Sequence, residues 1–171
     1  DNSWQNQDIV CNSSISNCYI ICQDETACMG AKIQCPSANC NIECNTRSCR
    51  SINVDLSDSI STQVTCMDQD ACNSMMISTS SSNSSAQQIA VSNNSSLNIM
   101  CKGEGSCSES IIQTNHAMLN IDCQGTEPCQ DQIINSRNNT LFTYQCYKNA
   151  TSASGTCLGS QLKVSPNAQS T

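Results

Sequence analysis

Aromatic side chains are scarce in this chain of 171 residues, at 3% of the sequence, and charged residues make up only 12%. This composition disfavours a broad globular core, which aromatic residues usually help to fill. The chain also has a single histidine, His116, and no two cysteines separated by two residues, the spacing typical of zinc and iron–sulfur sites. No apolar run is long enough to cross a membrane. We therefore expect no metal, no cofactor and no membrane span.

Basic residues are also few, seven against fourteen acidic residues, for a formal net charge of −7. This balance disfavours nucleic acid as a partner. Nucleophilic catalysis needs a serine or cysteine beside a positioned histidine and acid, and no motif surrounds His116, which we interpret as a polar loop residue. We expect a protein that is not an enzyme and has no catalytic residues.

Cysteine, in contrast, is abundant: there are sixteen, and many recur at a fixed interval. Cys22, Cys44 and Cys66 are 22 residues apart, Cys101 and Cys123 are again 22 apart, and Cys146 follows after 23. A repeat of this length is typical of a stacked solenoid. A low-complexity disordered chain is the alternative for a sequence so rich in Ser and Asn, but it does not explain the interval.

Apolar residues keep the same register around the cysteines. One column lies two places before each corner cysteine, and period-2 spacing places both residues on one face of a strand. A second column lies five places after the next cysteine, which predicts a second strand. The first column is Ile20, Ile42, Val64, Ile99, Ile121 and Tyr144, and the second is Ile33, Val54, Ile77, Ile112, Ile134 and Leu162.

These columns predict an all-β fold, a right-handed parallel β-helix of about seven coils of ~22 residues with disulfides at its corners. We expect one domain over residues 1–164 and a C-terminal tail or linker over 165–171. The interval from Cys66 to Cys101 is longer, 35 residues, and predicts an inserted segment or third strand over 79–96, with QQIAVS as its short strand. The chain begins half a coil early, with a strand that ends at Cys11.

Cysteines that are neighbours in the sequence flank each predicted corner. Spacing alone does not establish pairing, but a disulfide across each corner would staple every coil, at about 2 kcal/mol each in the chain-entropy model. So many disulfides indicate an oxidising, extracellular location. The expected pairs are Cys11 with Cys18, Cys22 with Cys28, Cys35 with Cys40, Cys44 with Cys49, Cys66 with Cys72, Cys101 with Cys107, Cys123 with Cys129, and Cys146 with Cys157.

Six N-x-S/T sequons support a secreted glycoprotein. All but one fall in predicted return loops or in the insertion, away from the main cysteine corners. They are Asn12, Asn83, Asn93, Asn94, Asn138 and Asn149, of which Asn149 lies in a cysteine corner.

Acidic residues gather in the cysteine corners. If the corners stack, these residues would form either a weak Ca²⁺-binding stripe or a solvated acidic edge, and the second interpretation is favoured because no EF-hand loop is present. They are Asp24, Glu25, Asp68, Asp70, Glu104 and Glu127.

The cycle of NIEC or NIDC, a short acidic or Gly-bearing corner, a cysteine and a strand ending in Ile resembles the cysteine-rich parallel β-helix repeats of large surface and secreted proteins of unicellular eukaryotes, algae included. The resemblance covers roughly residues 9 to 164 and concerns a repeat pattern. It implies an extracellular, glycosylated structural or adhesive module, often part of a longer chain or fibre.

We therefore expect a structural glycoprotein of a fibril, flagellar hair or surface coat, whose partners are copies of itself stacked head to tail and its own covalently attached glycans. The alternative is a β-helix that binds or cleaves carbohydrate. Such enzymes use paired carboxylates, whereas Glu43, Asp55 and Asp122 are predicted to face outward from strands without an obvious partner.

Overall fold

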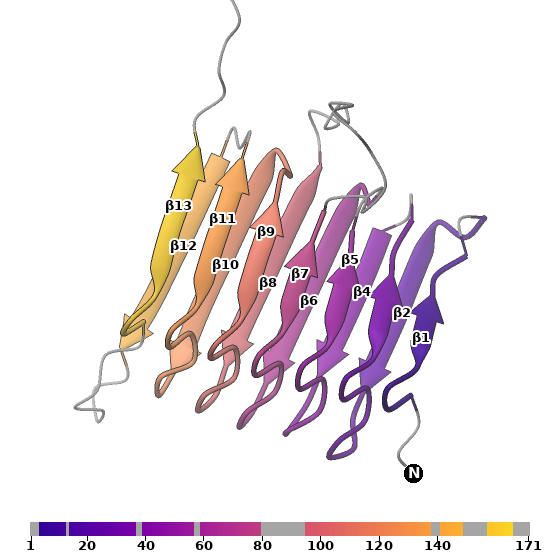
Figure 1. Ribbon diagram of the computed structural model, residues 1–171, viewed down its shortest axis with the longest axis horizontal. Helices are drawn as coiled ribbons and strands as arrows, with labels where there is room; N and C mark the ends of the chain where they lie inside the picture. Colours follow the sequence, from indigo (N-terminus) through magenta and orange to yellow (C-terminus); the bar gives the residue numbers. More distant parts are fainter. Residues whose placement is uncertain are drawn as a thin grey trace, which may run out of the picture.

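The computed structural model describes residues 4–12, 14–36, 39–56, 59–79, 95–137, 141–148 and 157–165. These residues form a parallel β-solenoid in which two sheets face each other across a narrow core (Figure 1). Every strand pair in both sheets is parallel. The predicted fold class is therefore confirmed.

One sheet has six strands and the other has seven, and the chain alternates between them. The six-stranded sheet contains β2 (Asn17–Cys22), β4 (Asn39–Cys44), β6 (Ser61–Met67), β8 (Ser96–Lys102), β10 (Met118–Gly125) and β12 (Leu141–Lys148). The seven-stranded sheet contains β1 (Asp8–Val10), β3 (Lys32–Gln34), β5 (Asn53–Asp55), β7 (Met76–Ser78), β9 (Ile111–Thr114), β11 (Ile133–Arg137) and β13 (Gln161–Ser165).

Equivalent residues of successive coils lie directly beside one another. Cys44 pairs with Cys22 and with Cys66, and Ile42 pairs with Ile20 and Val64. Strand residues alternate between buried and partly or fully exposed, so each strand sends one face into the core. The core is consequently a stack of Ile, Val, Leu and Cys columns, as the sequence predicted.

The number of coils is slightly smaller than the seven predicted. Six strand pairs, β2 with β3 through β12 with β13, are separated by five full turns, and β1 precedes them with no counterpart in the six-stranded sheet among the described residues. β6 pairs directly with β8 through Cys66 and Cys101, so the longer interval leaves the register intact. The strand predicted at QQIAVS lies outside the described residues, and the right-handed coiling remains a prediction.

The backbone of the main cysteine corner repeats its positive φ angles from coil to coil. In each coil a residue with positive φ recurs three places before the second apolar column: Asn6, Gly30, Ser51, Ser74, Glu109, Asp131 and Gly159. The N–H of each of the first six donates to a carbonyl of the following coil at 2.8 to 2.9 Å. These hydrogen bonds all run in the same direction along the rod, which gives this ladder a polarity.

Two glycines are required where corners of adjacent coils come closest. Gly103 and Gly125 have φ values of 112° and 134°, and a Cβ on Gly125 would lie 2.7 Å from the carbonyl oxygen of Gly103. Residues other than glycine rarely adopt these φ values. The last coils therefore use glycine to bring their corner backbones together.

Candidate functional site

The structure holds eight disulfides, each between cysteines that are neighbours in chain order, which are the pairs expected from the sequence. Their Cα atoms are 5.8 to 6.3 Å apart, within the usual range. Six close the main corner, and the other two, from Cys11 and Cys35, lie at the opposite corner. No described cysteine is free.

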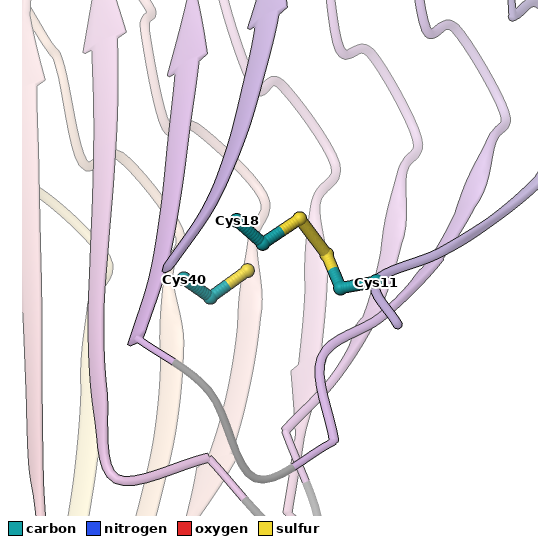
Figure 2. A group of neighbouring side chains, drawn as sticks. All are labelled: Cys11, Cys18 and Cys40. Carbon is teal, nitrogen blue, oxygen red and sulfur yellow. A yellow bond between two sulfur atoms is a disulfide. The ribbon is translucent and has the colours of Figure 1, made fainter. Parts of the chain in front are cut away.

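Sulfur atoms of neighbouring coils approach one another closely. The sulfur of Cys40 lies within 4.8 Å of both sulfurs of the Cys11–Cys18 disulfide (Figure 2). Similar groups form where Cys22 lies beside Cys44–Cys49, Cys101 beside Cys123–Cys129, and Cys123 beside Cys146–Cys157. Metals bind cysteine as the thiolate, and every sulfur of these groups is already in a disulfide. The arrangement is a stack of cross-links.

In the later coils the opposite corner replaces cysteine with polar side chains around His116. Nδ1 of His116 lies 2.9 Å from the hydroxyl oxygen of Thr114, and Nε2 lies 3.3 Å from that of Ser59. Thr62 donates to Ser59 at 3.0 Å. His116 does lie in a loop, as expected, but it is 3% exposed, which the sequence interpretation missed.

Burial lowers the pKa of His116 from 6.5 to about 4, because the charged imidazolium is poorly solvated there. The imidazole is therefore neutral at ordinary pH. Ser59 beside a histidine is the beginning of a catalytic arrangement, but a nucleophile must reach its substrate, and both side chains are buried. The cluster thus joins the corner before β6 to the corner before β10, on the side of the rod where cysteines lie in the first coils.

The strand carboxylates considered for carbohydrate cleavage do not form a pair. Glu43 and Asp122 occupy one outward column, but β6 and β8 separate their strands, so three strand spacings of about 4.8 Å lie between them. Asp55 belongs to the other sheet. Glycosidase carboxylates are about 5 to 9.5 Å apart. Asp122, moreover, accepts a hydrogen bond from Gln124 at 2.7 Å, a partner that the sequence did not indicate.

Two of the acidic corner residues interact with the neighbouring coil. Glu25 forms an ion pair with Arg47 at 3.1 Å, and Asp68 accepts a hydrogen bond from Thr46 at 3.2 Å. All four side chains lie at the solvent-exposed main corner. These contacts fit an acidic edge that is exposed to solvent and in which polar side chains of neighbouring coils interact.

Of the six sequon asparagines, only Asn12 falls within the described residues. Its side chain is exposed, and its Oδ1 accepts hydrogen bonds from the backbone N–H and the hydroxyl of Ser14, both at 2.9 Å. Asn83, Asn93, Asn94, Asn138 and Asn149 lie outside those residues. Asn12 is thus accessible at the corner between β1 and β2.

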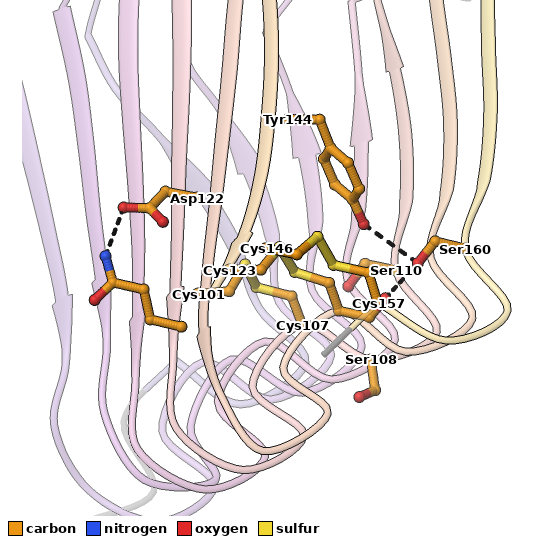
Figure 3. Close-up of a disulfide and its surroundings, with 12 residues drawn as sticks. Cys101, Cys107, Ser108, Ser110, Asp122, Cys123, Tyr144, Cys146, Cys157 and Ser160 are labelled. Atoms are coloured by element: carbon orange, nitrogen blue, oxygen red, sulfur yellow. Dashed lines mark hydrogen bonds between the residues drawn. A yellow bond between two sulfur atoms is a disulfide. The ribbon is translucent and has the colours of Figure 1, made fainter. Parts of the chain in front are cut away.

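Toward the C-terminal end the core contains polar side chains, among them those of Tyr144, Ser160 and Gln132. The hydroxyl of Tyr144 donates to Ser160 at 3.2 Å, and Ser160 donates to the carbonyl of Cys129 at 2.6 Å (Figure 3). Gln132, which follows Ile52, Met75 and Ser110 in an inward column, is fully buried, and its amide has no partner among the described residues.

Within the part of the chain that the structure describes, both ends of the rod carry strands that pair on one side only. β1 and β2 form one end, and β12 and β13 form the other (Figure 1). Among the described residues, nine of the twelve exposed large apolar side chains belong to these end coils: Trp4, Val10, Ile15, Tyr19, Ile21, Leu141, Tyr147, Leu158 and Leu162. The open edges and their apolar residues are the most distinctive surface of the protein.

Comparison of the chain with protein-family models, curated proteins and solved structures finds no match. Within the described part of the chain, no helix has the length and apolar character needed to span a membrane. The molecule is thus defined by its architecture, a cysteine-rich β-solenoid with a disulfide at each main corner.

Proposed function

We propose that this protein is an extracellular structural glycoprotein, a building block of a fibril, flagellar hair or surface coat that assembles by end-to-end stacking of solenoids. The cysteine-rich β-helix repeats of surface and secreted proteins of unicellular eukaryotes, which its sequence resembles, have roles of this kind. In this role the protein supplies a rod cross-linked by disulfides, and each end of the rod joins the end of another copy.

The observation that carries the proposal is the pair of open edges. β1, β2, β12 and β13 each have one unpaired side in the described residues. Natural sheets usually cover, shorten or charge such edges, because an unpaired edge is a template for another chain. Contacts between two different ends of a molecule generate an open filament unless the rotation closes a ring.

Disulfides and sequons support the extracellular setting. Eight disulfides in a chain of this length persist in oxidising compartments. Asn12 is exposed and available for N-linked glycan. Glycans along the flank would keep neighbouring rods apart laterally while leaving the ends free.

The second candidate is a β-helix that binds or cleaves carbohydrate. Parallel β-sheets with outward polar columns favour it in general terms, and here Asn41, Gln63, Asn98 and Asn120 form such a column on the six-stranded sheet. The separation of Glu43 from Asp122 argues against cleavage. Polysaccharide binding without filaments would favour this candidate.

Sedimentation velocity over a wide concentration range, with electron microscopy of the same samples, tests the proposal. We expect species that lengthen with concentration and appear as unbranched filaments one rod in width. A discrete monomer at every concentration, with no filaments, would reject the structural role.

A further inference from the structure

The two ends of the rod do not match simply, because the sheets have different numbers of strands. At the C-terminal end β12 and β13 belong to the same coil, so the two sheets end together. At the N-terminal end β1 extends the seven-stranded sheet by one strand beyond β2. One end is therefore flush and the other is stepped. This inference rests on the proposed function and specifies how copies would join.

The hydrogen-bond series of the seven-stranded sheet would continue without interruption if a second copy were placed beyond β13. In each coil the N–H at the start of the strand donates to a carbonyl of the preceding coil, as Lys32 donates to Gln7 at 2.9 Å and Gln161 to Gln132 at 2.8 Å. The next member of this series is the N–H of Asp8 in a second copy, donating to the carbonyl of Ser160. β1 of the second copy thus fits beside β13 of the first, with Ile9 beside Leu162.

The polarity of the corner ladder selects the same orientation. Asp131 donates its N–H to the carbonyl of Leu158 at 2.9 Å, and the next donor in the column is Gly159. Its counterpart at the other end is the carbonyl of Gln5, the residue before Asn6. Neither group has a partner among the described residues. Joining head to tail pairs them, whereas joining two C-terminal ends would place donor against donor and joining two N-terminal ends acceptor against acceptor.

Side chains at the two ends are complementary as well. With Ile9 beside Leu162, the exposed Lys163 lies diagonally across from the exposed Asp8 of the second copy, a separation that a lysine side chain spans. Leu162 is 50% exposed at the open end of its column, although its predecessor Ile134 is 1% exposed. A second copy would cover it.

We propose that copies join with β13 of one beside β1 of the next, so that the seven-stranded sheet is continuous along the filament. The six-stranded sheet is then interrupted at every joint, because one strand position stays open between β12 and the β2 of the next copy. Joining β12 to β2 directly would instead require β1 and β13 to occupy the same place. The intact chain can form the joint between β13 and β1, because that joint displaces no strand.

Charge exchange at the joint tests this pairing. Asp8→Lys places a lysine beside Lys163 of the neighbouring copy, and Lys163→Asp places two carboxylates together; each variant should weaken association about fivefold. Asp8 also neighbours Lys32 in its own sheet, so the decisive variant is Asp8→Lys with Lys163→Asp, which should restore association to within about twofold of the unmodified chain. Glu104→Lys, an equal charge change at an exposed corner in the middle of the rod, is the control and should have no effect of that size.

The axial repeat measured by electron cryomicroscopy gives an independent answer. The proposed joint adds seven strand spacings per copy, about 34 Å, whereas direct joining of β12 to β2 adds six, about 29 Å. A repeat of about 29 Å, or loss of association in the double variant, would overturn this joint and leave the proposed function standing. Absence of filaments under all conditions would reject both.

Discussion

The hydroxyl oxygen of Ser59 lies 3.3 Å from Nε2 of His116, although 57 residues separate them in the chain. The contact joins the corner before β6 to the corner before β10, two coils further along the rod. The hydroxyl of Thr114 makes the second contact, at Nδ1 of the same imidazole. Because burial keeps this imidazole neutral, the corner is sensitive to acid.

The first prediction concerns that sensitivity. The pKa of His116 is about 4 in the folded protein and 6.5 as the reference value. Between these values the unfolded chain binds more protons, so stability is full above pH 6.5 and falls as the pH drops toward 4. The loss should reach about 3 kcal/mol, since each pKa unit corresponds to about 1.4 kcal/mol.

Denaturant unfolding from pH 7 to pH 4 measures this loss, with His116→Gln as the comparison. His116 is the only histidine, so the variant retains the carboxylate contribution to acid sensitivity and lacks the histidine contribution. Equal slopes of stability against pH in the two proteins would contradict the assignment.

The second prediction uses the stacked sulfurs. Cys49→Ala leaves the thiol of Cys44 within 4.8 Å of the sulfur of Cys22. Attack of the Cys44 thiolate on that sulfur forms a Cys22–Cys44 disulfide and releases Cys28 as the thiolate, which then takes up a proton. Non-reducing peptide mapping should find this new bridge between coils.

Cys72→Ala is the matched control for this exchange. It leaves a thiol at Cys66, and Cys66 belongs to no such group of three sulfurs within the described residues. We expect Cys66 to remain a free thiol at pH 8. Equal exchange in both variants would show that the close approach of Cys22 and Cys44 does not direct the reaction.

The third prediction separates two glycines of the corner. Gly125→Ala should destabilise the protein by about 3 kcal/mol, because a Cβ there meets the carbonyl of Gly103 at an unfavourable φ. Gly105→Asn should cost less than about 1 kcal/mol, since Asn tolerates a φ near +60°. Arg47, Asp70 and Glu127 already hold similar angles in that column. Similar losses in chemical denaturation would contradict this reading of the corner.

The fourth prediction concerns the unpartnered amide in the core. Gln132→Met places an apolar side chain in the buried column of Ile52, Met75 and Ser110 and should stabilise the protein by about 1 to 3 kcal/mol, the usual cost of an unsatisfied buried polar group. Gln113→Met, at an exposed strand position, is the control and should change the free energy of unfolding little. A destabilised Gln132→Met variant would indicate that the amide has a partner.

The strands and their register were predictable from the sequence because parallel in-register stacking places the same residue type at the same level of every coil. Cys22, Cys44 and Cys66 therefore mark both the repeat and the corner. Ile33 and Val54 mark the second sheet for the same reason. The interval between equivalent residues in the sequence therefore equals the number of residues in one coil.

Burial of His116 was not predictable in this way, since it depends on Ser59 and Thr114, which belong to coils that lack cysteines at the opposite corner. The corner backbone was also hidden, because Arg47 and Asp70 adopt positive φ without being glycine. Hydrogen bonds between stacked coils hold those angles, and such bonds leave no compositional signature.

X-ray diffraction from aligned filaments tests the central claim most directly. If rods stack end to end, their strands lie across the filament axis, and the spacing between strands, about 4.8 Å, should appear as a reflection along that axis. We expect this reflection on the meridian together with the longer repeat of one copy. A 4.8 Å reflection on the equator, which places the rods across the filament, would contradict end-to-end stacking.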